Sequence, residues 1–179
     1  MAVISWGKPK IVVGPMNSLK TANAYALLPT PAEDSTQLTG QTGEKEEAKI
    51  EGGEVEAVKN KAGSSELVMR IRKAQGRTLP AVLLDATTDD GYTRENVSLC
   101  LQPENANAPG FYCGEGSVSI IDTYTAKEGA FWEITYNPVL PSTGSIKKKL
   151  SWGTVTLTEG TSTNAGKYTL GGTALGDNQ

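Results

Sequence analysis

The sequence contains no histidine among its 179 residues. Without histidine, the chain lacks the usual general base of Ser-His-Asp and Cys-His catalysis and the commonest protein ligand of zinc and iron. Paired carboxylates for sugar hydrolysis remain open, but nothing in the spacing of the 20 acidic residues singles out two of them. We therefore expect a protein that is not an enzyme and that has no metal site and no cofactor.

Long hydrophobic runs and cysteines are also scarce. No apolar stretch approaches the about 18 residues that a membrane helix needs, so we expect no membrane partner. Residues 1–9 show no basic region followed by an apolar run, which predicts a protein without a secretory signal, made and kept in a cytoplasm. In that reducing compartment, we expect the only cysteines, Cys100 and Cys113, to be free thiols.

Glycine and proline are abundant instead, at 20 and 9 residues, whereas hydrophobic residues make up only 37%. This mixture favours short strands joined by many turns, with surfaces that are completed only in an assembly. The net charge of −3 argues against general binding of nucleic acid or of anionic membranes.

Alternation of apolar and polar residues is the main structural signal. In the clearest segment, Leu67, Met69 and Ile71 alternate with charged neighbours. Residues 79–84 are the only helix candidate, with Pro80 in the first turn, and residues 23–28 fit either a strand or one helical turn. We predict a mainly β fold, a β-sandwich or barrel with at most one short helix, with strands over residues 2–6, 10–13, 66–72, 97–102, 117–124, 131–136 and 153–158.

Two polar stretches differ from this pattern. Residues 44–61 are strongly charged but alternate weakly, which predicts a long hairpin that turns near Gly52 and Gly53, with a solvated loop as the alternative. Residues 159–179 carry few large apolar groups and cannot offset their ordering entropy alone. We therefore expect a single β-rich domain over residues 1–158 and a polar C-terminal arm over residues 159–179, which a neighbouring subunit packs against.

The order of these features resembles that of bacteriophage tail-tube-type structural proteins, which are related to secreted ring-forming tube proteins. The resemblance rests on the acidic hairpin at 44–61, the strand at 66–72, the pair at 117–124 and 131–136, and the closing strand at 152–158. It implies a virion protein, assembled in the host cytoplasm, whose copies form stacked rings that let DNA pass without specific contacts. It implies no active-site residues. Members usually carry a clear helix, for which only residues 79–84 are available here.

The hairpin at 44–61 has too few apolar residues to fold onto a core of its own. Such a segment gains stability by adding to the sheet edge of a neighbour, and its mixed charges suit pairing with another copy. A Ser-Trp-Gly sequence also occurs near both ends of the chain and fits two edge strands. The predicted subunit interface therefore comprises Glu44, Glu47, Glu51, Glu54, Lys59, Lys61, Trp6, Trp152 and Tyr168.

Other functions fit the same composition. One alternative is a capsid-decorating or connector protein of a virion, which also contacts other virion proteins. Another is a carbohydrate-binding β-sandwich module, which should present a row of exposed aromatic rings. The three tryptophans, Trp6, Trp132 and Trp152, are scattered along the sequence, which counts against the second alternative.

Overall fold

The fold is built from antiparallel strands. The computed structural model of the chain describes residues 7–15, 26–83, 92–142, 148–158, 167–170 and 173–174, and no helix occurs among them. The larger sheet, which we call sheet A, has seven strands. In spatial order they are β14 (Thr173–Ala174), β13 (Lys167–Leu170), β12 (Ser151–Thr158), β9 (Pro109–Cys113), β8 (Val97–Gln102), β1 (Lys10–Pro15) and β2 (Ala26–Leu27).

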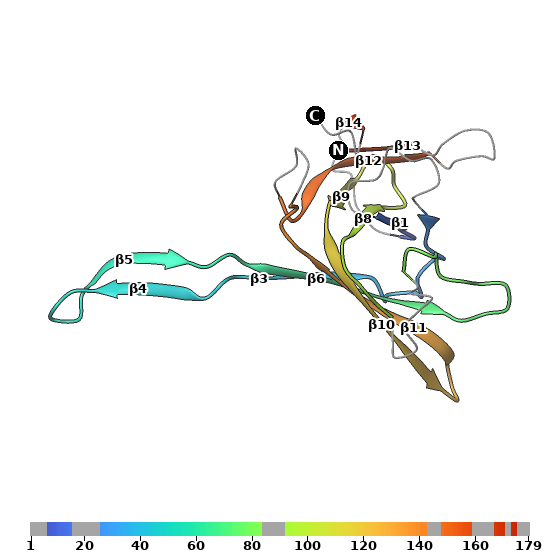
Figure 1. The fold of residues 1–179 in the computed structure, drawn as a ribbon, viewed down its shortest axis with the longest axis horizontal. Coiled ribbons are helices and arrows are strands. Elements are labelled where there is room, and N and C mark those ends of the chain that lie inside the picture. The colour runs from blue at the N-terminus through green and yellow to red at the C-terminus, as the bar shows by residue number, and fades with distance from the viewer. Residues whose placement is uncertain are drawn as a thin grey trace.

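A second sheet of five strands, sheet B, lies across sheet A, and a two-stranded hairpin projects far from both (Figure 1). The projecting hairpin consists of β4 (Lys45–Lys49) and β5 (Val55–Asn60). In spatial order, sheet B contains β3 (Gln37–Gln41), β6 (Ser64–Arg72), β11 (Gly129–Pro138), β10 (Gly116–Thr125) and β7 (Tyr92–Arg94).

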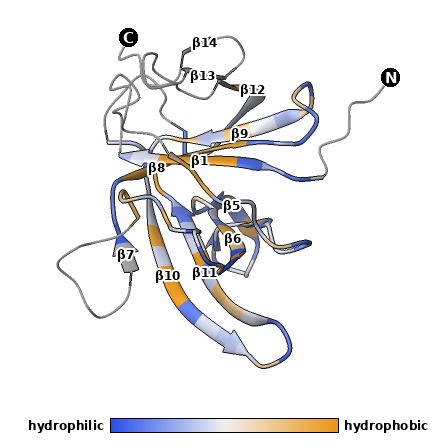
Figure 2. Cartoon of the chain, turned by 90° about the vertical axis from the view of Figure 1, so that its right-hand side faces the viewer, coloured by the Kyte–Doolittle hydropathy of each residue, from blue (hydrophilic) through white to orange (hydrophobic). Residues whose placement is uncertain are grey.

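The core lies between the inner faces of the two sheets. On β6, Leu67, Met69 and Ile71 are buried while the alternate residues are at least partly exposed, which confirms the alternation expected for residues 66–72. Ile11 and Leu99 face them from sheet A within one hydrophobic cluster. Figure 2 shows the hydrophobic residues along β1 and the alternation along β10. The mainly β, sandwich-like prediction is confirmed.

Strand β8 differs from its prediction because all six of its residues are buried. In a strand over residues 97–102, simple alternation of apolar and polar residues places Val97, Leu99 and Leu101 on the buried face. The polar residues on the opposite face are accommodated by hydrogen bonds, as buried polar groups require. The Ser98 hydroxyl donates to the carbonyl oxygens of Gly14 and Pro15 at 3.2 and 3.1 Å, and the Gln102 amide donates to the carbonyl oxygen of Val155 at 2.9 Å.

The helix candidate at residues 79–84 forms a turn instead. The backbone N–H of Leu83 donates to the carbonyl of Pro80 at 2.9 Å, while Leu79 and Leu83 are both buried in the core. Six residues are too few to offset the cost of nucleating a helix, so the two leucines determine the local conformation. Leu84, residues 2–6 with Trp6, and residues 23–25 lie outside the described part of the chain.

The C-terminal segment contributes strands to sheet A. Strand β13 pairs with β12, with Tyr168 opposite Leu157, and β14 pairs with β13. The tail therefore forms backbone hydrogen bonds within its own subunit at residues 167–170 and 173–174. The expected contact of the tail with a neighbouring subunit stays a prediction.

One buried hydroxyl connects the two sheets. Tyr136 on β11 is fully buried and donates its hydroxyl proton to the carbonyl oxygen of Val97 on β8 at 2.9 Å. Gly116 lies against the ring of Tyr136, where a Cβ atom would overlap with it. The phenol is therefore enclosed, and its oxygen has a fixed partner on the opposite sheet.

Replacing Tyr136 with phenylalanine should destabilise the protein by about 1–2 kcal/mol, because the carbonyl of Val97 loses a buried hydrogen bond. Chemical denaturation followed by circular dichroism measures the change. Tyr124→Phe is the matched control, since Tyr124 is 74% exposed and should tolerate the loss of its hydroxyl. Equal stabilities for the two variants would show that the hydroxyl does not hold the sheets together.

The two cysteines are unbridged, as expected. Cys113 lies opposite Leu99, the neighbour of Cys100, so the two thiols point to opposite faces of sheet A. Burial raises the pKa of the Cys100 thiol from an ordinary value of 9.0 to about 12, and burial also raises the pKa of Cys113. Both groups therefore stay protonated when the protein is folded.

A thiol reagent at pH 8 should find no reactive group in the native protein and two in the unfolded, non-reduced chain. The raised pKa values also make stability depend on pH. In the unfolded chain the thiols ionise above pH 9, whereas in the folded protein Cys100 stays protonated to about pH 12. The free energy of unfolding therefore falls as the pH rises through that range. Rapid labelling of the native protein would contradict this burial.

Candidate assembly surfaces

The projecting hairpin, which we call the arm (residues 44–61), continues the β3–β6 pair of sheet B. Gln41 lies opposite Ser64 and Lys45 lies opposite Asn60, so three residues separate the paired segments on each strand. The backbone N–H of Lys61 also donates to the carbonyl of Glu44 at 2.9 Å. The arm is therefore a hairpin rather than a loop, in register with the sheet from which it projects.

Two glycines allow the strands to approach closely where the arm joins sheet B. A Cβ atom on Gly43 would overlap with the carbonyl of Lys61, and one on Gly63 would lie 2.5 Å from the carbonyl oxygen of Gln41. At the far end, Gly52 and Gly53 both have positive φ values, 101° and 85°. The turn thus falls where the sequence predicted it.

The charged residues of the arm pair largely with one another. Lys61 contacts Glu44 at 2.8 Å and Glu46 at 3.0 Å, and hydrogen bonds to these two carboxylates raise the pKa of Lys61. Lys45 and Lys49 both pair with Glu47. Exposed pairs of this kind contribute little stability. They leave fewer lysines for the expected pairing with another copy.

Every described residue of β4 and β5 is exposed to solvent. The aliphatic side chains of Val55 and Val58 on β5, and of Ile50 directly after β4, are among the exposed residues of the arm, and Val58 is 52% exposed. No third strand joins the two-stranded sheet among the described residues. A hairpin with two open edges and no core is marginally stable by itself and presents unpaired backbone groups to any approaching strand.

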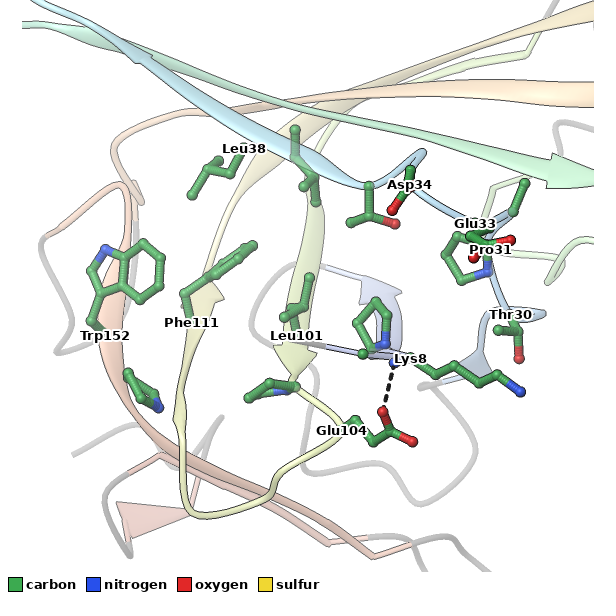
Figure 3. A pocket seen from close by; sticks show the side chains of 17 residues that line it. Lys8, Thr30, Pro31, Glu33, Asp34, Leu38, Leu101, Glu104, Phe111 and Trp152 are labelled. Carbon is green, nitrogen blue, oxygen red and sulfur yellow. Dashed lines mark hydrogen bonds between the residues drawn. The ribbon is translucent and has the colours of Figure 1, made fainter. Parts of the chain in front are cut away.

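A groove of about 840 Å³ opens between the two sheets beside β3 (Figure 3). Its apolar lining comes from both sheets and includes Leu38, Leu101, Phe111 and Trp152. The indole of Trp152 packs on the ring of Phe111 with centroids 5.2 Å apart. The groove is therefore a gap in the sandwich where apolar side chains meet solvent.

Charged residues lie toward the other end of the groove from Trp152 (Figure 3). Glu33 and Asp34 precede β3 in the chain, and Asp34 adopts a positive φ of 55°. Glu104 accepts a hydrogen bond from the backbone N–H of Lys8 at 3.2 Å. With three carboxylates and one ammonium group, this end of the groove is acidic.

The predicted interface residues fall into separate regions. The strands of the arm carry Glu47 and Lys59, and its base carries Glu44 and Lys61. The turn of the arm carries Glu51 and Glu54. Trp152 lines the groove. Tyr168 is placed only through the backbone pairing of β13. The structure therefore brings the arm residues together and separates them from Trp152.

Sequence reasoning missed the other groove residues. Leu38 lies in a polar stretch between a turn and the arm, and Glu33 and Asp34 resemble ordinary turn residues. Their proximity to Phe111 depends on the packing of the two sheets, for which no local pattern provides a signal. A hydrophobic residue isolated between polar neighbours, such as Leu38, was the only available clue.

Neither a protein-family model nor a curated protein sequence matches this chain. Within the described ranges, no group of three or more Cys, Asp or Glu side chains is arranged to hold a metal ion. The same residues include no helix that is long and apolar enough to span a membrane.

A side chain at the base of the arm should loosen it without affecting the core. In Gly43→Ala, the added methyl group must displace the carbonyl of Lys61, so amide hydrogen exchange in the arm should accelerate while the midpoint of global unfolding stays the same. Gly40→Ala is the control, because a Cβ at Gly40 meets nothing within 4 Å. Equal exchange in the two variants would contradict the close approach at Gly43.

Proposed function

We propose that this chain is a structural subunit that assembles with copies of itself, most specifically a tail-tube-type virion protein whose stacked rings provide a conduit for DNA. The observation that carries the proposal is the arm. It projects from the sandwich and exposes all of its described strand residues. It also has two open edges in the described structure.

An exposed hairpin of this kind has a physical reason to bind another protein. Its aliphatic residues Ile50, Val55 and Val58 are exposed, and burying them against a second surface releases water from apolar area. Its backbone groups gain partners by strand addition. The glycines at the joint hold the arm in register with sheet B, so part of its ordering entropy is lost before association, which lowers the cost of binding.

The distribution of charge supports a conduit that does not hold DNA. The net charge is −3, and on the outer face of sheet B, Arg70 pairs with Glu133 at 3.2 Å and with Glu128 at 3.4 Å. Unpaired basic residues would bind phosphates by releasing counterions and would slow the passage of DNA. Arginine that already pairs with carboxylates has less tendency to do so.

The alternative of a glycan-binding module has less support. Such a module needs neighbouring aromatic rings that stack on consecutive sugars. The groove offers one exposed ring, Trp152, since Phe111 is buried beneath it, and the exposed Tyr124 lies on β10 in sheet B rather than among the groove residues. A capsid-decorating or connector protein would use the same assembly surfaces and differs in its partners.

Replacing residues 46–58 with a short Gly-Ser turn should give a folded monomer, whereas the intact protein should form rings or tubes. Size-exclusion chromatography with light scattering measures the mass, and negative-stain electron microscopy shows the shape. Val58→Asp should weaken assembly in the same direction, because the exposed aliphatic surface gains a charge. The matched control is Ile121→Asp, since Ile121 is also an exposed aliphatic residue but lies on β10.

The unfolding midpoint of the arm-replacement variant should equal that of the intact protein, since the arm contributes nothing to the core. An intact protein that remains monomeric at all concentrations would contradict the proposal. So would an arm-replacement variant that assembles as the intact protein does.

A further inference from the structure

Sheet A is wider than sheet B on the side of β3. Trp152 on β12 lies opposite Phe111 on β9, whose side chain is buried in the core. The side chain of Trp152 therefore points toward the inside of the sandwich, yet it is 59% exposed. The next residues on the same face, Thr154 and Thr156, are exposed as well. Inner faces of a sandwich are normally covered by the opposite sheet. Here no described strand of sheet B extends over β12.

The strand of sheet B next to this uncovered face has a free edge. β3 is the terminal strand of sheet B and pairs only with β6 among the described residues. Edge strands usually carry a lysine, a proline or a bulge that prevents further pairing. The sequence of β3, Gln37-Leu38-Thr39-Gly40-Gln41, contains none of these. A sixth strand at this edge would pair with β3 and cover Trp152.

We propose that the arm of a second copy supplies this strand: its β5 adds to the free edge of β3 and closes the groove over Trp152. The inference rests on the proposed self-assembly and identifies the surface that receives the arm. The lengths match, because β5 has six residues and β3 has five. The arm provides an open edge, and the groove provides an apolar surface that needs a cover.

The backbone of β5 presents its unpaired groups at suitable positions. In an antiparallel pair, alternate residues direct their N–H and C=O groups toward the partner strand. Lys61 directs its N–H at Glu44. Asn60 and Val58 lie one and three residues before Lys61, so they direct their N–H and C=O groups at the outer edge of β5. These groups are available to a second strand.

Charge selects the direction of the added strand. Glu33 and Asp34 precede β3, so the acidic end of the groove lies at the start of that strand. With β5 antiparallel to β3, Lys59 approaches this acidic end, while Glu51 and Glu54 at the tip of the arm lie beyond the opposite end, near Gln41. A parallel strand would bring the acidic tip to the carboxylates and would be repelled.

The antiparallel direction has a consequence for the assembly. If β5 of the second copy runs against β3 of the first, then β4 of the second copy runs along β3, and both arms point the same way. The arm and the groove are different surfaces, so each copy can give one contact and receive another. Repetition of this contact builds a polar stack rather than a closed pair.

Cysteine cross-linking tests the contact directly. A chain with Val58→Cys, mixed with a chain carrying Thr39→Cys and a size tag, should form a disulfide-linked heterodimer under mild oxidation, since both side chains are exposed and the two strands become neighbours. The native cysteines are buried and should not react under these conditions. Lys127→Cys, in the turn between β10 and β11, replaces Thr39→Cys as the control. Equal yields with the two acceptor chains, or no product with Thr39→Cys, would overturn the proposal.

Assembly of groove variants separates this inference from the proposed function. Trp152→Ala and Thr154→Arg should each raise the concentration needed for assembly at least tenfold, whereas Ser119→Arg, on the exposed outer face of sheet B, should not. Thr154→Arg decides the matter if Trp152→Ala does not fold.

If replacement of the arm abolishes assembly but the groove variants assemble normally, the groove is not the receiving surface and the proposed function still stands. If the intact protein never assembles, the proposed function fails and this inference fails with it.

Discussion

The burial of apolar side chains between two sheets of unequal width is the constraint on which this structure depends. Residues such as Met69, Ile71 and Ile134 on sheet B are buried against Ile11 and Leu99 on sheet A. The hydroxyl of Tyr136 fixes the relative position of the sheets through the carbonyl of Val97. Because sheet B ends at β3, the same packing that buries the core leaves the inner face of β12 uncovered at Trp152.

Sheet B determines the position of the arm but does not bury any of its strand residues. The register of β3 and β6 continues through Gly43 and Gly63 into β4 and β5, so the rigid sheet orients a hairpin that has no core of its own. The exposed ion pairs of Lys61 and Glu47 add little stability. The molecule therefore holds an open strand pair at one end and an open groove in its body, and the proposed assembly with other copies rests on this combination.

Much of the fold could be predicted from the sequence because β-strands leave a local pattern. Alternation identified residues 66–72, where Leu67 and Met69 are buried, and Gly52 and Gly53 marked the turn of the arm. The pattern failed for β8, since a central strand covered on both faces buries Ser98 as fully as Leu99. It also failed for residues 79–84, where burial of two leucines prevailed over a weak helical preference.

The sequence by itself determined the charged hairpin, the lack of histidine and the strands over residues 10–13, 66–72, 97–102, 117–124, 131–136 and 153–158. Each of these follows from residue types along a short stretch of chain. Only the tertiary structure decided that Trp152, Leu38 and Glu33 line one groove. These residues are far apart in the sequence and meet through the packing of two sheets, whose relative width depends on which strands pair. The local sequence does not predict that the indole of Trp152 is exposed, because its exposure depends on whether the opposite sheet covers it.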